Sequence, residues 1–350
     1  MIHEDPEVID VRTEERLDTA KLEPYLREHL PEATGGFALR QFGGGHANLT
    51  YLVRFGDSEY VLRRPPLGPL PERAHDMRRE HAVLSKLYAS FPLAPRSYHL
   101  CADHAIIGAD FVIEERKHGI AMRRDLPEAL HGDRVFAQRL GRALIETLAA
   151  LHHVDVIAAG LQELGHPAGY VTRQLDGWTR RWEAARTAHT ANASVLVDWL
   201  REHLPPSPAA TLVHNDYKLD NMLLDPQDPA RITALLDWDM CTYGDPLMDL
   251  GYVLALWPEA SDPPAFRLWG MPTWREGFMT RGEVVAAYGQ ATGFDVSAAG
   301  WYHVFNIFRF AAILQQIYKR YDTGATHDER FREFGEQANA LVHVATSLAR

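Results

Sequence analysis

Several features that mark other classes of protein are scarce in this sequence or missing from it. Only two cysteines, Cys101 and Cys241, occur in 350 residues, and such a pair is more typical of reduced thiols than of a disulfide framework. No apolar run reaches the length of about 18 residues that a membrane-spanning helix needs. The first residues, MIHEDPEVIDVRTEERL, have no apolar stretch typical of a signal peptide. These absences predict a cytoplasmic protein.

Basic residues are also in the minority. The chain has 36 Lys and Arg against 47 Asp and Glu, a formal net charge of −11. An acidic surface does not attract nucleic acid or an anionic membrane, so neither is expected as a partner. The 18 histidines show no metal-site spacing, so no zinc site is expected. With 46% hydrophobic and 24% charged residues, the composition is that of an ordinary soluble protein of one large or two smaller domains.

The first third of the chain changes its periodicity twice. Residues 13–30 place leucines at helical spacing, with Thr13 as a candidate N-cap, and we assign residues 1–34 to an N-terminal helical extension. The segments TYLVRF and EYVLRR flank GDS, which predicts a β-hairpin. Helical spacing returns over 75–89, and the strand-like segments HAII and DFVIEE predict two further strands. Residues 35–117 are therefore expected to form a small sheet with one helix against it.

The rest of the chain, residues 118–350, is mostly helical in pattern. The segment DRVFAQRLGRALIETLAALHHV carries an apolar stripe, and WYHVFNIFRFAAILQQIYKRY is again long and helical. Three short strand-like segments, TLVH, NMLLD and ITALLDWD, interrupt the helices. The fold class is therefore α+β: a small antiparallel sheet with one helix, followed by a larger helical domain.

The densest polar cluster lies between two of these strands, in LVHNDYKLDNMLLD. His-x-Asp-x-x-x-x-Asn is the spacing that kinase-type phosphoryl-transfer sites use: Asp216 would orient a hydroxyl and accept its proton, and Asn221 would bind magnesium. A second metal ligand is then expected at the end of a later strand, and Asp237 lies 16 residues after Asn221. The alternative is that these acidic residues only cap turns, but two correctly spaced elements favour a functional role.

These motifs resemble the small-molecule kinases of the aminoglycoside phosphotransferase and choline kinase type. The similarity is greatest to the phosphotransferase-like region fused to some large acyl-CoA dehydrogenases. It lies in LVHNDYKLDNMLLD, ALLDWDMCTYGDPLMDLGY, GGGHANLTYLV and YVLRRPP, and covers most of residues 35–330 in the expected order. The resemblance implies a bilobal, protein-kinase-like fold and transfer of the γ-phosphoryl group of ATP, with Mg²⁺, to a hydroxyl of a small molecule.

The resemblance also implies roles for single residues of the loop. Asp216 would be the catalytic base, with Asn221 and Asp237 as the metal ligands. His214 would brace the loop by hydrogen bonding rather than react. Lys218 would neutralise charge on the transferring phosphoryl group, although a solvated loop lysine remains the alternative.

In the first domain, Arg63 stands where kinases place the lysine that contacts the α- and β-phosphates, and Glu80 would pair with it. Arginine in place of lysine is a departure, because a planar guanidinium grips phosphate differently from an ammonium group. Arg64 is the rival for this role. Strand alternation places Arg63 on the face of Val61, so we favour Arg63.

The glycine cluster GGGHANLT would cover the phosphates. Gly43, Gly44 and Gly45 would let the backbone approach them, and Asn48 would add an amide donor near the place of the missing third glycine. A flexible hairpin turn is the alternative. In FVIEERKHG, Glu114 and Arg116 would offer main-chain groups to adenine.

The acceptor is the least defined part of the prediction. The resemblance to the dehydrogenase-fused kinases points to a hydroxyacyl compound, with its CoA thioester as one form, so a hydroxyacyl compound or another metabolic hydroxyl ranks above an aminoglycoside. Anionic groups on it could meet any of five arginines, for which solvated helix faces are the alternative: Arg123, Arg124, Arg173, Arg180 and Arg181. The resemblance also implies that the acceptor pocket is formed by helices that carry six residues of this sequence: Tyr170, Trp178, Trp182, Trp301, Asn306 and Arg309. Ordinary helix packing is the favoured alternative for any one of them, and Trp182 and Arg309 are the candidates for pocket walls.

Two other functions fit the sequence less well. A catalytically silent nucleotide-binding module would normally lack one of Asp216, Asn221 and Asp237, and all three are present. A protein kinase would carry an APE-like segment and a long activation loop after Asp237, and neither is found.

Overall fold

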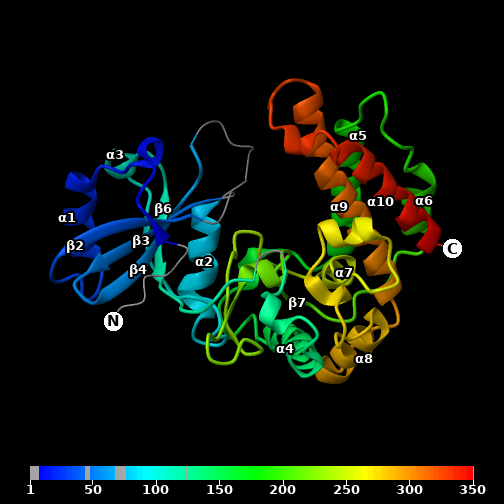
Figure 1. Cartoon of the computed structure of the whole chain (residues 1–350), viewed down its shortest axis with the longest axis horizontal. Coiled ribbons are helices and arrows are strands. Elements are labelled where there is room, and N and C mark those ends of the chain that lie inside the picture. Colours follow the sequence, from blue (N-terminus) through cyan, green and yellow to red (C-terminus); the bar gives the residue numbers. More distant parts are fainter. Residues whose placement is uncertain (1–7, 44–47, 68–75, 123–124, 350) are drawn as a thin grey trace. The chain divides into compact units, whose positions relative to one another are not determined.

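The computed structural model describes residues 8–43, 48–67, 76–122 and 125–349 (Figure 1). The chain divides into two compact units. Unit 1 consists of residues 1–119, 157–164 and 233–241, and unit 2 of residues 120–156, 165–232 and 242–350. The short segment that contains Asp237 therefore belongs to unit 1, whereas the loop that contains Asp216 belongs to unit 2.

Unit 1 is built on a six-stranded antiparallel sheet. Its spatial order is β1-β2-β3-β4-β6-β5. The strands are β1 (Val8–Ile9), β2 (Phe37–Phe42), β3 (Leu49–Phe55), β4 (Ser58–Arg64), β5 (Ser97–Cys101) and β6 (Phe111–Glu115). The predicted hairpin is confirmed: β3 pairs with β4, and Phe55 lies opposite Ser58. Gly56, at the turn, has φ +59°, a left-handed conformation that glycine adopts without strain.

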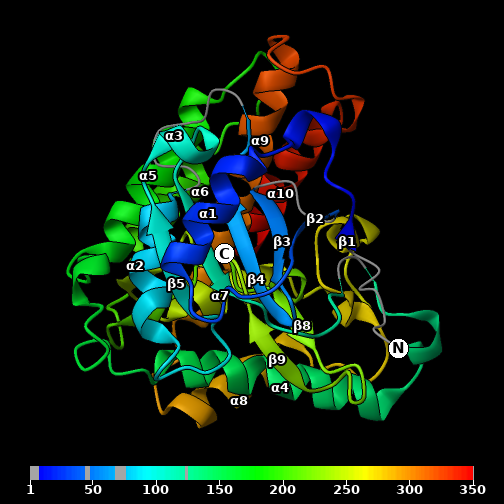
Figure 2. The same cartoon turned by 90° about the vertical axis from the view of Figure 1, so that its left-hand side faces the viewer.

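The two faces of this sheet carry different helices (Figures 1 and 2). Helix α1 (Thr19–His29) packs Leu22 and Leu26 against Tyr60 and Leu62 of β4 in one hydrophobic cluster. Helix α2 (Met77–Leu87), capped by the Asp76 side chain, lies on the other face. Because side chains alternate along β4, its odd-numbered residues point toward α2.

Two local predictions for unit 1 were wrong. The N-terminal helix begins at Thr19 rather than after Thr13, because residues 13–15 form a separate 3-10 turn. The Tyr51 hydroxyl donates a hydrogen bond to the Glu15 carbonyl oxygen of this turn. HAII is a one-turn helix, α3 (His104–Ile107), and not a strand. The Asp103 side chain caps its start and Gly108 ends it in a left-handed conformation. The strands that the sequence missed in unit 1 are β1 and β5. A short apolar run fits either structure.

Unit 2 is mainly helical, as predicted. Its α-helices are α4 (Arg134–His152), α5 (Tyr170–Ala184), α6 (Ser194–Glu202), α7 (Leu247–Ala255), α8 (Arg281–Thr292), α9 (Ala299–Asp322) and α10 (Phe334–Leu348). Its short strands include β7 (Thr211–Val213), which pairs with β10 (Thr242–Gly244), and β8 (Met222–Leu224). β9 (Ile232–Leu235) leads into the Asp237 segment. None of the helices in the described ranges is long and apolar enough to cross a membrane.

Helix α7 lies against α9 at very close range. A Cβ atom on Gly251 would come within 2.5 Å of the Tyr302 carbonyl oxygen, so only glycine fits there. The Asn306 side chain donates to the carbonyl oxygens of Met248 and Tyr302, which ties the two helices together. This contact fixes α7, the helix that follows the Asp237 segment in the sequence.

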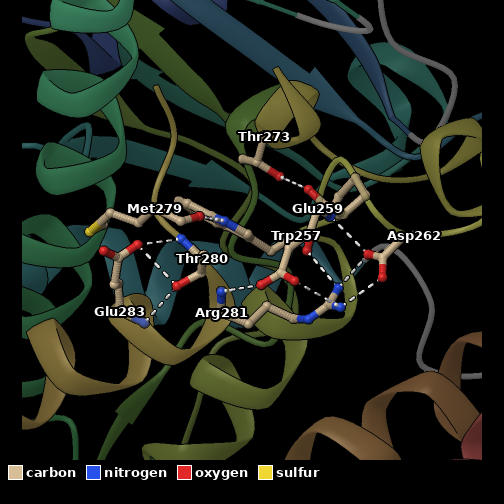
Figure 3. Close-up of polar contacts among 9 residues, drawn as sticks. Trp257, Glu259, Asp262, Thr273, Met279, Thr280, Arg281 and Glu283 are labelled. Carbon is tan, nitrogen blue, oxygen red and sulfur yellow. Dashed lines mark hydrogen bonds and ion pairs between the residues drawn. The ribbon is translucent and has the colours of Figure 1, made fainter. Parts of the chain in front are cut away.

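The start of α8 is held by an ionic network (Figure 3). Thr280 and Glu283 form a capping box. The Arg281 guanidinium binds both carboxylate oxygens of Asp262 at 2.6 and 2.8 Å, and the Arg281 amide donates to Glu259. Burial raises the pKa of Asp262, but hydrogen bonds from Arg281 and the Glu259 amide lower it more, so it stays below its usual value.

Replacing Asp262 with asparagine is expected to lower the free energy of unfolding by about 1–3 kcal/mol, because Arg281 loses its bidentate partner. A carboxylate with a depressed pKa stabilises the fold above its unfolded pKa, and this contribution is lost as the pH falls through its folded pKa. The variant should therefore match the wild type in acid and fall behind at neutral pH in urea unfolding. Glu276→Gln, on the exposed pair with Arg134, is the control and should change nothing measurable. An equal loss for both variants would contradict the structural role of Asp262.

Candidate active site

The loop after β7 is anchored by one buried carboxylate. Asp249 of α7 accepts the backbone amides of His214 at 2.6 Å and Asn215 at 2.7 Å. Asn215 has φ +65°, a left-handed conformation that asparagine tolerates better than most residues. His152 lies 3.3 Å from the same carboxylate. The loop conformation is thus imposed by a partner far away in the sequence.

Three donors surround the Asp216 side chain. Lys218 Nζ lies 3.0 Å from Oδ1 and 2.9 Å from Oδ2. The Asn221 amide nitrogen donates to Oδ2 at 2.7 Å and to the Asp216 carbonyl oxygen at 2.9 Å. The Tyr252 hydroxyl donates to Oδ1 at 2.6 Å. The carboxylate is therefore held in one orientation.

The geometry of Asn221 bears on its proposed role as a metal ligand. Both of its side-chain hydrogen bonds within the described residues use the amide nitrogen, which leaves the amide oxygen for a cation. Hard cations such as Mg²⁺ prefer oxygen ligands of this kind. His214 is fully buried, and its Nδ1 accepts the Asp216 amide at 3.3 Å, so it contacts the loop backbone.

Sequence reasoning missed Tyr252 and the backbone contact of Arg309. Tyr252 lies three residues after Asp249 on α7, so one helix face carries both residues that hold the loop. Arg309, on α9, donates to the Asn215 carbonyl oxygen at 2.7 Å. The spacing Asp-x-x-Tyr was a usable signal for Tyr252, whereas nothing local links Arg309 to the loop.

Unit 1 carries a second charged cluster, on the α2 side of the sheet. Arg63 lies between two carboxylates: Nη1 is 2.6 Å from Glu80 and Nη2 is 2.8 Å from Asp237. Arg64 points to the other face, where its guanidinium donates to the Ile107 carbonyl oxygen. The structure therefore brings together Arg63, Glu80 and Asp237, and excludes Arg64 from this cluster.

Glu114 joins this cluster through its side chain. Burial raises its pKa to about 7, with Arg63 lowering it and Asp237 raising it. Burial also raises the pKa of Glu80, which Arg63 partly offsets. Burial lowers the pKa of Arg63, but the surrounding carboxylates outweigh this and keep the guanidinium charged. The sequence predicted that Glu114 acts through its main chain. On β6, between β4 and β5, its side chain also contributes to the electrostatic field around Arg63.

The Asp237 segment is fixed inside unit 1. Asp237 has φ +68°, an unusual conformation for a residue other than glycine. On one side of it, the Leu235 amide donates to the Leu93 carbonyl oxygen at 2.9 Å. On the other, the Arg79 guanidinium binds the Cys241 carbonyl oxygen at 2.9 and 2.7 Å. Three non-glycine residues of the described chain have positive φ. Two of them belong to the predicted site: Asp237 is a predicted metal ligand, and Asn215 precedes Asp216.

The glycine segment is described only at its ends. Gly44 and Gly45 lie outside the described residues, as do Arg123 and Arg124. Gly43 accepts a hydrogen bond from Arg12, and Asn48 is buried at the start of β3. The Arg116 guanidinium lies 4.6 Å from the centre of the Phe42 ring, so this side chain reaches from the end of β6 to the end of β2.

The residues proposed for the acceptor pocket divide into core and surface. Trp182 is fully buried against Phe308 and belongs to the core. Arg309 and Arg181 both stack on Trp178, at 5.3 and 4.6 Å from its ring centre. The others have structural contacts. Tyr170 binds the Asn215 side chain, Trp301 binds the Leu200 carbonyl oxygen, and Arg173 of α5 binds carbonyl oxygens of the segment before that helix. Arg180 is exposed.

Arg181 also opens onto a pocket of about 380 Å³ between α5 and α9. Lys319 and Arg320 line the same pocket, and no acidic side chain does. Lys319 donates to the Ala184 carbonyl oxygen at 2.7 Å. Burial, together with the neighbouring Arg309 and Arg180, lowers the pKa of Arg181. The pocket is therefore a concentration of positive charge in an acidic chain.

The sequence pattern of the phosphotransferase enzyme family matches residues 38–299, a span that contains the glycine segment, Arg63, Glu80, the Asp216 loop and Asp237. The chain belongs to this family. Curated relatives include acyl-CoA dehydrogenase family member 10 of Mus musculus, 32% identical over 98% of the chain, and family member 11 of Gallus gallus, 31% identical over 99%. The chain spans only 32% and 45% of the lengths of these two relatives.

Solved structures confirm the kinase-like α+β fold predicted from the motifs. A crystal structure from Ralstonia eutropha, provisionally named an aminoglycoside phosphotransferase, is 30% identical, with a TM-score of 0.82 over 95% of this chain and 98% of its own. Choline kinase from Cryptosporidium parvum (13% identity, TM-score 0.59, 95% of each chain) has the same fold. So does aminoglycoside phosphotransferase APH(4)-Ia in complex with AMP-PNP and hygromycin B (17%, 0.57, 92% of this chain and 98% of that one).

Proposed function

We propose that this phosphotransferase moves the γ-phosphoryl group of ATP, with Mg²⁺, to a hydroxyl of a small molecule. The observation that carries the proposal is the arrangement around Asp216. A carboxylate is held by Asn221, Lys218 and Tyr252 on a loop whose backbone Asp249 fixes. Phosphoryl transfer depends mainly on positioning and charge stabilisation, which such a rigid carboxylate can supply.

Asp216 would accept the proton of the attacking hydroxyl. Its two oxygens already accept hydrogen bonds from Tyr252 and Asn221 and make two contacts with Lys218. These four contacts fill the roughly four lone-pair positions of a carboxylate. The hydroxyl must replace one donor. Lys218 has the flexible side chain, and its movement toward the transferring phosphoryl group would open that position.

Asn221 and Asp237 would hold the magnesium ion. Their donor set, one amide oxygen and one carboxylate, fits a hard cation. The ion would neutralise charge on the phosphates. Arg63, kept charged by Glu80, would contact the phosphates as a bidentate donor. Its present bond to Asp237 keeps that carboxylate in place beside the arginine.

For the acceptor we favour a hydroxyacyl compound over an aminoglycoside. The relatives that match nearly the whole chain are named as acyl-CoA dehydrogenase family members. The pocket lined by Arg181, Lys319 and Arg320 supports an acceptor with an anionic end, such as a CoA thioester, and is unfavourable for a cationic antibiotic.

The direct test is an ATP-consumption screen with Mg²⁺ against hydroxyacyl-CoAs, amino alcohols, sugars and aminoglycosides. We expect ADP release with a hydroxyacyl-CoA or its free acid. Turnover with an aminoglycoside alone would overturn the acceptor assignment. ATP binding without consumption across the panel would instead support a silent nucleotide-binding module.

Changing both Arg181 and Arg320 to glutamine is expected to raise KM for an acyl-CoA acceptor by about 3- to 30-fold, since each exposed charge contributes modestly. The KM for ATP should not change, and the effect should shrink at high salt. Steady-state kinetics at two ionic strengths measure this. Arg186→Gln is the matched control, because Arg186 is already neutralised by Glu183. An unchanged KM in the double variant would remove this pocket from the acceptor site.

A further inference from the structure

The Tyr252 hydroxyl makes the shortest of the contacts to the Asp216 carboxylate, 2.6 Å from Oδ1. Unlike Lys218, Tyr252 cannot swing away, because it is buried on α7, one residue after the glycine packed against the Tyr302 backbone. Burial, and then the charge of Asp216, raise the pKa of Tyr252 well above its usual value, so the phenol keeps its proton and donates. A neutral donor aimed at a carboxylate forms a strong, charge-assisted bond.

Arg309 adds a second restraint at the same place. Its guanidinium lies 5.0 Å from the centre of the Tyr252 ring, and it donates to the carbonyl oxygen of Asn215, the residue before Asp216. Arg309 is 3% exposed, and this charge on the ring face polarises the phenol as a donor. The side chain and the backbone of the catalytic loop are thus held from two neighbouring helices, α7 and α9.

We propose that Tyr252 is a positioning residue for catalysis: with Arg309 behind it, its hydroxyl fixes one oxygen of Asp216 so that the other is presented to the acceptor hydroxyl. The expected effect on kcat rests on the proposed function, whereas the contact between Tyr252 and Asp216 does not. A carboxylate that can rotate presents the correct oxygen for only part of the time, so the loss appears in kcat rather than in binding.

Tyr252→Phe removes only the hydroxyl and leaves the ring for Arg309. We expect kcat to fall by about 10- to 100-fold, the range that one charge-assisted hydrogen bond supplies. KM for ATP and the affinity for Mg²⁺-ADP should stay within about twofold of the wild type, as Tyr252 has no role in nucleotide binding.

Tyr302→Phe is the matched control. It breaks a buried bond of the same kind, from the Tyr302 hydroxyl to Asp245 at 2.5 Å, whose acceptor is a carboxylate other than Asp216. We expect it to lower the melting temperature while kcat per folded molecule is kept. A wild-type kcat in Tyr252→Phe would overturn the proposal, as would a loss shared equally by both variants.

A second measurement needs no substrate. Urea unfolding of Tyr252→Phe, Asp216→Asn and the double variant forms a mutant cycle, and the double change should cost less than the two single changes together. Strict additivity would overturn the positioning contact. If the wild type phosphorylates no acceptor but the cycle shows coupling, the proposed function fails and the contact stands. If the wild type phosphorylates an acceptor and Tyr252→Phe has the same kcat, the proposed function stands and the positioning role fails.

Discussion

Asp216→Ala is expected to lower kcat by about a thousandfold to a hundred-thousandfold while leaving the affinity for nucleotide nearly unchanged. The carboxylate is the group that would accept the proton of the attacking hydroxyl, and Lys218, Asn221 and Tyr252 all direct hydrogen bonds to it. Removing it abolishes both the acceptor of the proton and the centre of that arrangement. Single-turnover kinetics at saturating substrate isolate the chemical step.

Asp216→Asn is the companion variant, because it keeps the shape of the side chain and removes its charge. Both variants should still unfold cooperatively, with a loss of stability no larger than the lost contacts to Tyr252, Asn221 and Lys218 explain, and both should bind Mg²⁺-ADP. If Asp216→Ala retained near-normal turnover on the true acceptor, Asp216 would not be the base, and another group would have to orient the hydroxyl.

Asp237→Asn is expected to weaken the Mg²⁺-dependent part of nucleotide binding by more than about 10-fold. Losing a residue that only hydrogen-bonds a metal ligand already costs about that much metal affinity, and losing the ligand itself should cost at least as much. Asp237 also binds Arg63, so the change will affect nucleotide binding without metal as well. Titrating the nucleotide with and without Mg²⁺ separates the loss of the metal ligand from the loss of the Arg63 contact. The gain in nucleotide affinity that Mg²⁺ provides should shrink only if Asp237 binds the metal.

Asp239→Asn is the matched control for this experiment. It removes the same charge two residues further along the same segment. Its magnesium titration should follow that of the wild type. Equal weakening in both variants would show that the negative charge of the segment matters and that Asp237 is no specific ligand.

The sequence predicted the elements of the fold that have local signals. The hairpin of β3 and β4 is set by two strand-like runs around a glycine turn, and the long stripes of α4 and α9 have an unmistakable period. The strand prediction for HAII was wrong because the three apolar residues after His104 fit a strand or a helical turn equally well. Its flanking residues decide: Asp103 supplies a cap and Gly108 a stop, and both are visible only once a helix is considered.

The candidate site was predictable where its residues share one loop, and less so elsewhere. Asp216 and Asn221 are five residues apart, so their contact follows from local spacing. The pairing of Arg63 with Glu80 follows from strand alternation and a helix on the right face. Arg309 comes from a helix almost a hundred residues later, and only the packing of α7 on α9 brings it to the Asn215 carbonyl oxygen. Such contacts leave no periodic trace in the sequence.

The most direct test of the account is a ³¹P NMR assay of the purified chain with ATP, Mg²⁺ and a hydroxyacyl-CoA. Phosphoryl transfer to the hydroxyl predicts a new phosphomonoester signal that grows in step with ADP, one for one, and that chelating the metal abolishes. ADP accompanied only by inorganic phosphate, or ATP left intact with every acceptor tried, would contradict it.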